Sequence, residues 1–100
     1  MVHPYLRAHL DLLFLALIDQ EPRAPDTVLR AVQEQFGKKF APSRQLTYST
    51  LHYLERNRLI QPLETDSRRY ALTSSGRRSL DMRIKQWELF TEGVRSVLRR

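Results

Sequence analysis

The chain contains no cysteine, and only three of its 100 residues are glycine. Without cysteine there is no disulfide bond, no thiol nucleophile and no thiolate metal site. The three glycines lie too far apart to form a loop that cradles phosphate groups, and the Gly-x-Ser-x-Gly motif of many hydrolases is missing. The three histidines are not spaced as metal ligands. The sequence therefore predicts a protein that is not an enzyme and that uses no metal and no cofactor.

A long hydrophobic run is also missing. The longest one, residues 12–18, lies between Asp11 and Asp19, whereas a transmembrane helix needs about 20 apolar residues. The residues before it do not show the basic, apolar and small-residue order of a secretion signal. We therefore expect a cytoplasmic protein that does not bind a membrane. Its 41% of hydrophobic residues suffices for one core, and association with a second copy would increase the buried area.

The chain has fewer acidic than basic residues, and the two kinds are unevenly distributed along it. The formal net charge is +6 and the pI is near 10.3. Residues 1–37 carry three basic and five acidic residues, whereas residues 38–100 carry 14 basic and six acidic residues, a net charge of +8. A field of this sign favours a polyanionic partner such as nucleic acid. The alternative is an ordinary solvated basic surface.

Apolar residues in the first 37 positions recur at helical spacing. They predict one helix over residues 4–19, which is apolar on nearly all sides after Leu12 and belongs in the centre of the core. Two prolines then interrupt the pattern, and Pro25 with Asp26 suits the first turn of a second helix that ends at Gly37. The residues of this second helix that are expected to face inward are Val28, Leu29, Val32 and Phe36.

A third helix is predicted to follow Ser43, which would be its N-cap. Strand patterns follow at residues 59–64 and 69–73, separated by a turn, and Pro62 indicates an edge position. A helix followed by a two-stranded hairpin with a basic tip is the order of a winged helix-turn-helix module. We therefore predict a mainly α fold with a small two-stranded β wing. The polar side of the third helix carries Gln45, Tyr48, Ser49, His52 and Arg56.

The pattern becomes helical again from residue 74 or 75 to the C-terminus. At 1.5 Å per residue this helix would be roughly 37 Å long and would project from the rest of the chain. Its apolar residues are spaced by four and three positions, as in the seam between two paired helices. We therefore expect a winged-helix domain over residues 1–74 and a dimerisation helix over residues 75–100, within one compact unit. The predicted dimer interface consists of Leu80, Ile84, Trp87, Thr91, Val94 and Leu98.

Two sequence blocks resemble the PadR family of bacterial transcriptional regulators. Members of that family show a Tyr-Pro-x-Leu-x-x-Leu-Glu-x-x-Gly-Leu-Ile run and then an Arg-x-Tyr-x-Leu-Thr-x-x-Gly block. Here residues 48–60 read Tyr-Ser-Thr-Leu-His-Tyr-Leu-Glu-Arg-Asn-Arg-Leu-Ile, and residues 69–76 read Arg-Tyr-Ala-Leu-Thr-Ser-Ser-Gly. The leucine-rich residues 10–18 are similar to the family's first helix. The resemblance covers most of residues 6–80 and implies a homodimeric winged-helix repressor, often with a small effector near the dimer interface.

Several positions depart from the family pattern. Ser49 replaces the usual proline and Arg58 the usual glycine, so the helix is expected to start differently and its end to lack an easy left-handed cap. Gln45 and Leu46 stand where the family has glycine and a small hydroxyl residue. The family's His-Gly-Tyr sequence at the second helix is replaced by Ala-Pro-Asp at residues 24–26. We expect these departures to change the DNA sequence that is recognised more than the fold.

The third helix, about residues 43–57, is predicted to enter the major groove, and the wing, about residues 64–70, to contact the flanking backbone. Guanidinium groups suit the wing because each binds phosphate with two hydrogen bonds. The alternative for these side chains is a solvated surface, and for the tyrosine it is packing of its ring under the wing. The predicted DNA-binding residues are Ser43, Arg44, Gln45, Tyr48, Ser49 and His52 in the helix, Arg68 and Arg69 in the wing, and Lys38 and Lys39 before the helix.

Together these features predict a sequence-specific transcriptional regulator that binds double-stranded DNA and acts as a homodimeric repressor. The alternative, favoured by the departures, is a winged-helix module that binds a protein partner instead of DNA. Trp87 is predicted to lie in the dimer interface, and the alternative implied by the resemblance is a small hydrophobic effector stacked on it. Arg77 and Arg78 begin the last helix, where a cation is unfavourable, so each is expected to contact DNA or an acidic residue.

Overall fold

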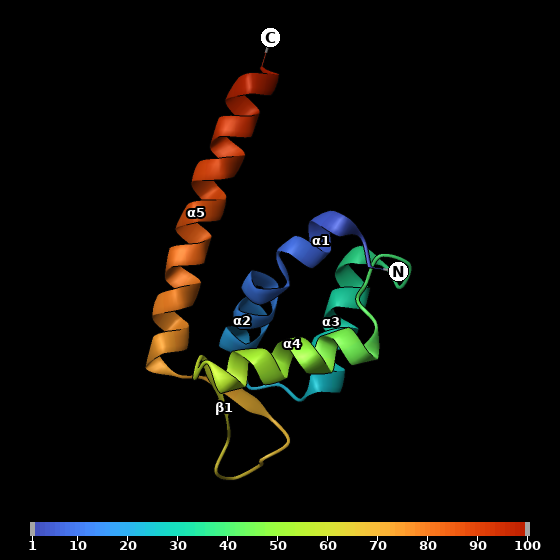
Figure 1. The fold of residues 1–100 in the computed structure, drawn as a ribbon, viewed down its shortest axis with the longest axis vertical. Helices are drawn as coiled ribbons and strands as arrows, with labels where there is room; N and C mark the ends of the chain where they lie inside the picture. Colours follow the sequence, from blue (N-terminus) through green and yellow to red (C-terminus); the bar gives the residue numbers. More distant parts are fainter. Residues whose placement is uncertain (1, 100) are drawn as a thin grey trace.

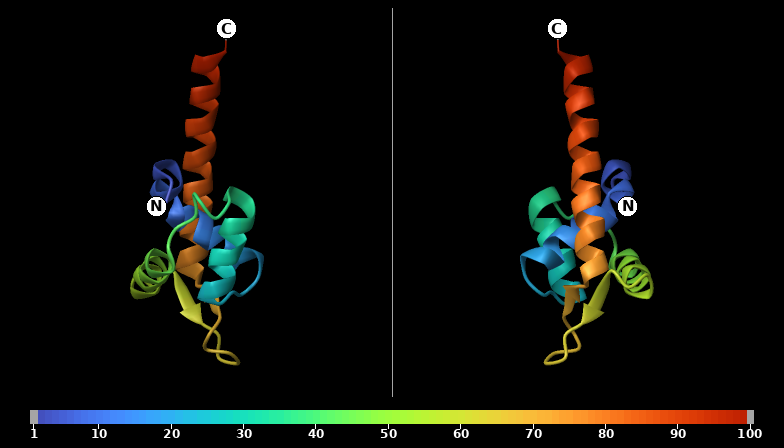
Figure 2. Two further views of the ribbon diagram at one scale, coloured as in Figure 1. Left: turned by 90° about the vertical axis from the view of Figure 1, so that its right-hand side faces the viewer. Right: turned by 90° about the vertical axis from the view of Figure 1, so that its left-hand side faces the viewer.

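The computed structural model describes residues 2–99, which form a small helical body, a hairpin and one long helix (Figure 1). The hairpin lies at one end of the body, beneath the helix that precedes it, and the last helix rises from the body as a straight rod (Figure 2). The molecule measures 53 × 31 × 20 Å along its principal axes. The elements are α1 (Pro4–Ala8), α2 (Leu10–Gln20), α3 (Pro25–Phe36), α4 (Arg44–Arg56), β1 (Ile60–Pro62), β2 (Tyr70–Leu72) and α5 (Ser74–Leu98).

The N-terminal segment forms two helices, so the prediction of one continuous helix over residues 4–19 was wrong. The chain leaves helical geometry at His9, whose φ and ψ are −121° and 18°. The imidazole of His9 meets the indole of Trp87 edge to face, with 4.9 Å between the ring centroids. This break leaves Leu6 and Leu10, on either side of it, both buried in the core.

The core is centred on α2, as the sequence predicted. This helix contacts α3, α4, α5 and β2, and its Phe14 and Leu15 are fully buried. In α3, Val28 and Val32 are buried as expected, but Phe36 is 44% exposed. The inward placement of Phe36 was therefore wrong, because this last residue of α3 lines an apolar surface cavity and not the core.

Local capping signals begin and end the helices as expected. Pro25 occupies the first turn of α3, and Gly37 ends that helix with a φ of +84°, a left-handed value that favours glycine. The Ser43 hydroxyl caps α4 by accepting a hydrogen bond from the Leu46 N–H at 3.0 Å. These caps fix where the polar face of α4 starts.

The hairpin pairs β1 and β2 in antiparallel fashion, with Gln61 opposite Ala71. Both strands are shorter than the sequence predicted, because each keeps its ladder over only three residues. On its other side β2 exchanges two backbone hydrogen bonds with the α2–α3 connector, between Tyr70 and Arg23, at 2.8 and 3.1 Å. The wing is therefore attached to the body through both neighbours of β2.

The turn after α4 has the left-handed cap that the sequence was expected to lack. Arg58 supplies it with a φ of +62° although it is not glycine. The chain then passes so close to α5 that a Cβ at Gly76 would overlap the carbonyl oxygen of Leu59. A glycine is thus required at position 76 for the start of α5 to pack on the turn after α4.

The long helix α5 is buried only near its start, where Gly76 and Leu80 face the body. Arg77 in its first turn forms an ion pair with Asp19 at 2.6 Å, which confirms the expectation of an acidic contact. The later apolar side chains of α5 are exposed, among them Leu89 at 71% and Phe90 at 61%. Within residues 2–99, none of the helices has the length and apolar character needed to cross a membrane.

Candidate nucleic-acid interface

The two sides of α4 differ in burial as the helical wheel predicted. Thr47, Leu51 and Leu54 are fully buried against the body. The opposite side is solvent-facing, because the side chains of Arg44, Gln45, Ser49 and His52 are exposed and that of Tyr48 is half-buried. The predicted reading residues of this helix therefore occupy one accessible face.

A cleft of about 590 Å³ lies between α4, the hairpin and the start of α3. From α4 it is lined by Tyr48 and His52, whose rings stand nearly perpendicular, at 85°, with centroids 6.5 Å apart. From the hairpin it is lined by residues 66–70, which include the predicted contact residues Arg68 and Arg69. The cleft thus brings together four of the predicted site residues from two elements.

The remaining predicted residues do not line this cleft. Gln45 and Ser49 lie on the exposed face of α4, and the Ser49 hydroxyl donates to the Leu46 carbonyl at 3.1 Å. Lys38 lines a separate hollow beside Ser43 at the N-terminal end of α4, together with Arg7. Lys39 is exposed in the same connector. Lys38 therefore lies in a different hollow from the cleft that Arg68 and Arg69 line.

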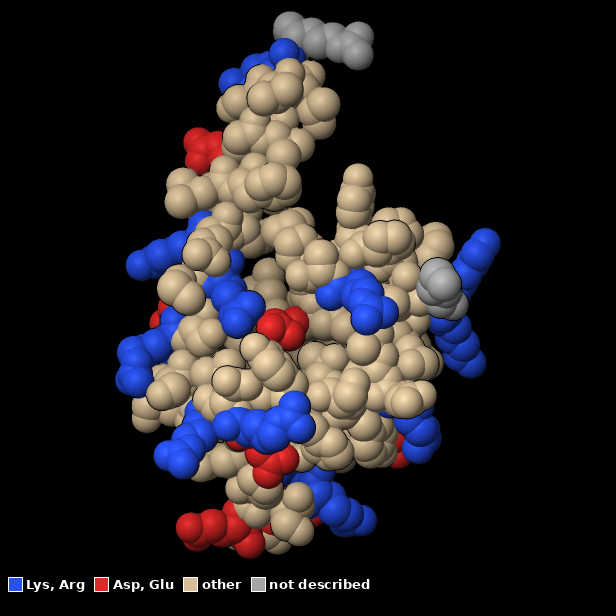
Figure 3. Space-filling model, viewed as in Figure 1, with Lys and Arg blue, Asp and Glu red and all other residues tan. Residues whose placement is uncertain are grey.

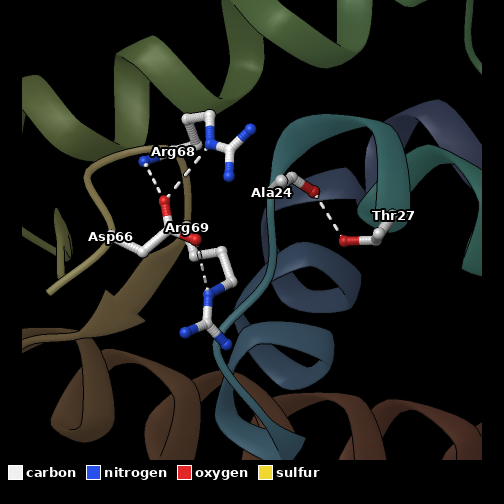
Figure 4. A network of polar contacts seen from close by, with 5 residues as sticks. All are labelled: Ala24, Thr27, Asp66, Arg68 and Arg69. Atoms are coloured by element: carbon white, nitrogen blue, oxygen red, sulfur yellow. Dashed lines mark hydrogen bonds and ion pairs between the residues drawn. The ribbon is translucent and has the colours of Figure 1, made fainter.

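The tip of the hairpin is organised by Asp66 (Figure 4). Its Oδ1 accepts hydrogen bonds from the backbone N–H of Arg68 at 3.1 Å and from Arg68 Nε at 3.4 Å. Its Oδ2 accepts from Arg69 Nε at 3.2 Å. The hydrogen bond from the Arg68 backbone is the main cause that holds the pKa of Asp66 below its ordinary value. The same contacts favour the charged form of Asp66.

A second carboxylate, Asp26, stands where α3 meets α4. Its Oδ1 accepts a hydrogen bond from the hydroxyl of Tyr48 at 3.2 Å and lies 3.4 Å from a guanidinium nitrogen of Arg44. The Tyr48 hydroxyl therefore has an internal partner in the free chain, in addition to the two roles that its sequence position suggested. One carboxyl oxygen holds two side chains that are one turn apart on α4.

The hairpin is fixed to α4 by Tyr70. Its side chain is 8% exposed, and its hydroxyl donates to Glu55 Oε1 at 2.8 Å. Burial is the largest cause that raises the pKa of Tyr70, followed by the hydrogen bond and the charge of Glu55, and the pKa is about 12. This contact couples the position of the wing to the last turn of α4.

Sequence reasoning missed several residues of this region as site residues. Asp26 and Pro25 were assigned to a helix start and Asp66 and Ser67 to a turn, although all four line the cleft. The signal for Asp66 was present, because an aspartate two residues before an arginine commonly accepts that residue's backbone N–H. The pairing of Asp26 with α4 had no local signal.

The predicted dimer seam on α5 is divided by the fold. Leu80 is 2% exposed and already belongs to the core of the single chain, so it offers little surface to a partner. Ile84, Trp87, Val94 and Leu98 are exposed by between 38% and 71%. Thr91 is half-buried and its hydroxyl donates to the Trp87 carbonyl at 3.0 Å.

An apolar cavity of about 410 Å³ lies beside Trp87, between α5, the N-terminal helices and the end of α3. Its walls are largely aromatic and aliphatic, with His3 and His9 among them. Among residues 2–99, no three acidic or histidine side chains meet as the ligands of a metal ion would. The lining residues are His3, Tyr5, Leu6, His9, Leu12, Leu13, Phe36, Phe40 and Trp87.

The fold is that of known transcriptional regulators. A PadR-like transcriptional regulator from Bacillus cereus superposes with a TM-score of 0.84 at 19% identity, over 98% of this chain and 99% of that chain. A transcriptional regulator from Clostridium thermocellum gives 0.80 at 18% identity, over 99% of both chains. A Streptococcus transcriptional regulator gives 0.79 at 20% identity, over 97% and 99%. Comparison with protein-family models and with curated protein sequences finds no match.

Proposed function

We propose that the chain is a sequence-specific DNA-binding transcriptional regulator of the PadR type. The observation that carries this proposal is the cleft in which Tyr48 and His52 of α4 meet Arg68 and Arg69 of the hairpin. A winged helix reads DNA with a helix in the major groove while the wing contacts the adjacent backbone, so both sets of residues must face one side. The net charge of +8 in residues 38–100 supports a polyanionic partner.

The proposed active form is a homodimer joined through α5. The exposed apolar side chains of this helix, such as Trp87 and Val94, would be covered by the same helix of a second copy. A two-fold dimer would present two α4 helices to two half-sites of a palindromic operator. Repression is the proposed direction of regulation, on the basis of the family resemblance.

A small hydrophobic effector is proposed to bind in the apolar cavity beside Trp87. The cavity is large enough for a ligand of modest size, and its lining offers aromatic rings for stacking. Because Trp87 also belongs to the proposed dimer seam, a bound effector would act on the geometry of α5.

Selection of duplexes from a random library, followed by binding measurements over a range of salt concentration, tests the proposal. We expect one sequence to be bound with a roughly nanomolar Kd. Arg68→Ala should reduce the log-log salt slope by about 0.9, as expected for one lost phosphate contact. Arg95→Ala removes the same charge near the far end of α5 and should leave the slope unchanged. His52→Ala should change the preferred sequence.

The outcome that contradicts DNA binding is the absence of any enriched duplex at low salt. The chain would then be better interpreted as a protein-interaction module, which keeps the winged-helix fold but reads no bases. In that case Arg68→Ala and His52→Ala would have no effect on the oligomer or on any regulated promoter in a reporter strain.

A further inference from the structure

The arginines assigned to DNA contact are each held by a carboxylate of the same chain. Arg44 lies 3.4 Å from Asp26, and Arg68 and Arg69 lie 3.4 and 3.2 Å from Asp66. In Figure 3 the acidic side chains near the hairpin end stand among the basic ones, so the basic surface is interrupted there. A surface built only for affinity toward phosphate would keep its arginines free of such partners.

We propose that Asp26 and Asp66 are specificity-determining residues, which weaken binding to random DNA while orienting Tyr48 and the three arginines for one sequence. This inference rests on the proposed function and adds two acidic residues to the proposed reading surface. It assigns them two effects of opposite sign on DNA binding, one from charge and one from geometry.

The first effect is electrostatic and opposes binding to every duplex. Random DNA is held almost entirely through its phosphates, so its affinity depends on the net charge of the surface. Asp66 offsets one of the two positive charges of Arg68 and Arg69, and Asp26 offsets the charge of Arg44. The three carboxyl–guanidinium distances, 3.2 to 3.4 Å, lie well within one Debye length of about 8 Å, so salt screens these pairs only in part.

The second effect is geometric and favours only the duplex that fits. Asp66 uses both oxygens and its own backbone carbonyl to fix the hairpin tip, since the Arg69 N–H also donates to that carbonyl at 3.0 Å. Asp26 fixes the Tyr48 hydroxyl and Arg44 through a single oxygen. Side chains that are held in place lose less conformational entropy when a matching sequence binds them.

The guanidinium groups remain accessible while they are paired. The side chain of Arg68 is 87% exposed, that of Arg44 68% and that of Arg69 45%. Ion pairs at such exposure are weak, so a duplex can share or displace the carboxylates without unfolding the hairpin. The carboxylates therefore tune binding and do not block it.

The experiment compares Asp26→Asn and Asp66→Asn with matched controls. Asparagine keeps an oxygen acceptor for the Tyr48 hydroxyl and for the Arg68 N–H, so the fold and the turn are preserved while the charge is removed. The two controls are Glu34→Gln, at a residue of α3 like Asp26, and Glu64→Gln, at a residue two positions before Asp66. Neither control residue forms an ion pair within residues 2–99, and both are exposed.

Binding is measured by fluorescence anisotropy with two duplexes of the same length. One is the sequence that the unmodified chain selects from a random library, and the other is a mixture of random sequences. Each aspartate variant should bind the random duplex about three- to fivefold more tightly at low salt, the effect of one charge near a phosphate in water. Affinity for the selected duplex should change less, so the ratio of the two affinities should fall. The glutamate controls remove a charge that orients no arginine, so any gain in affinity should be equal for the two duplexes and the ratio should stay unchanged.

A second set of variants tests whether Asp66 acts through the arginines. In the Arg68→Ala and Arg69→Ala double variant, Asp66→Asn should no longer lower the ratio of the two affinities, because no arginine is left for Asp66 to orient, although the loss of its charge should still strengthen binding to both duplexes. If Asp66→Asn behaves like Glu64→Gln, or if the affinity ratio does not fall, the inference is wrong although the proposed function stands. If the unmodified chain binds neither duplex at low salt, the proposed function is wrong and the inference with it.

Discussion

The hydroxyl of Thr73 donates a hydrogen bond to the backbone carbonyl of Arg58 at 2.6 Å. The same oxygen accepts from the Gly76 N–H at 2.9 Å, so Thr73 caps α5 while it holds the end of α4. The Thr73 N–H donates to the Leu59 carbonyl at 3.1 Å. These contacts fix the angle between the proposed reading helix and the proposed dimerisation helix, and in a dimer that angle would set the distance between the two reading helices.

Replacing Arg58 with glycine should stabilise the chain. Arg58 has a left-handed φ of +62°, which costs a residue with a side chain roughly 1–2 kcal/mol. Glycine removes that cost but loses more backbone entropy on folding, so we expect a net gain of about 0.5–1 kcal/mol in the free energy of unfolding. Denaturant unfolding followed by circular dichroism measures it.

Arg56→Gly is the matched control, because it removes the same side chain from the last residue of α4, where the backbone is helical. It should lower the free energy of unfolding by about 1 kcal/mol. Equal effects of the two substitutions would contradict the assignment of backbone strain to residue 58.

Alanine at the two glycines of α5 should have opposite effects. At Gly76 the new methyl group would overlap the Leu59 carbonyl, so we expect a loss of about 1–3 kcal/mol in stability. At Gly93 no atom outside the local helix backbone lies within 4 Å of the new methyl group, so alanine should gain up to about 1 kcal/mol of helix stability. Thermal unfolding of both variants measures the difference.

The Gly93→Ala variant also tests how closely two α5 helices approach in a dimer. If the glycine is needed for close contact between copies, the variant would be more helical but would dissociate at a higher protein concentration. A Gly76→Ala variant as stable as the unmodified chain would show that α5 can move away from the turn after α4.

Features that depend on neighbouring residues were predictable from the sequence. Ser43 caps α4, Pro25 begins α3 and Gly37 ends it, because each role needs only a short stretch of chain. The order of helix, hairpin and final helix followed from the change in hydrophobic spacing, and the structure confirms the mainly α fold with a two-stranded wing. The polar face of α4 was predicted from its helical spacing alone.

Features that depend on contacts between distant segments were not predictable in this way. The helix break at His9 coincides with its contact with Trp87 on α5, and periodicity treats these segments separately. The Tyr48 hydroxyl donates a hydrogen bond to Asp26, which lies 22 positions earlier in the chain. Arg58 adopts a left-handed conformation in the turn whose next residue, Leu59, lies against Gly76 of α5. The pairing of Asp26 with Tyr48 and Arg44 could therefore be located only in the folded chain.

The stability of the chain should decrease between pH 10 and pH 12 because of Tyr70. Its pKa is raised from 10.0 to about 12 in the folded chain, so the unfolded chain loses this proton first as the pH rises. The stabilisation is complete below pH 10 and is lost as the pH passes 12. Tyr70→Phe should remove this component and cost about 1–3 kcal/mol at neutral pH, since a hydrogen bond to a charged group is lost.

The measurement is an absorbance titration near 295 nm combined with denaturant unfolding at several pH values. The difference between the unmodified chain and Tyr70→Phe should show one phenol that ionises near pH 12. Tyr53→Phe on α4 is the control, because Tyr53 is 48% exposed and should contribute little to stability. If Tyr70→Phe instead removes a phenol that ionises near pH 10, then burial and Glu55 do not raise the pKa of Tyr70.

Trp87 should report the association of two chains. It is the only tryptophan and is 41% exposed in the single chain. If α5 pairs with the α5 of a second copy, the indole loses contact with water, and its fluorescence maximum should move to shorter wavelength as the protein concentration rises. Val94→Asp places a charge in the same seam and should abolish the shift, because a buried unpaired carboxylate is strongly unfavourable. Sedimentation equilibrium measures the mass in parallel.

Ser96→Asp separates an effect of charge from an effect of position. Residue 96 is exposed and lies two positions from Val94, which turns it by about 200° to the opposite side of the helix. This variant should associate as the unmodified chain does. Equal loss of association in both variants would indicate that added negative charge on α5 is responsible. A constant emission maximum, with the mass of one chain at all concentrations, would contradict the dimer itself.

Because DNA half-sites are bound by two reading helices, Val94→Asp should also weaken binding to a palindromic duplex far more than binding to a half-site.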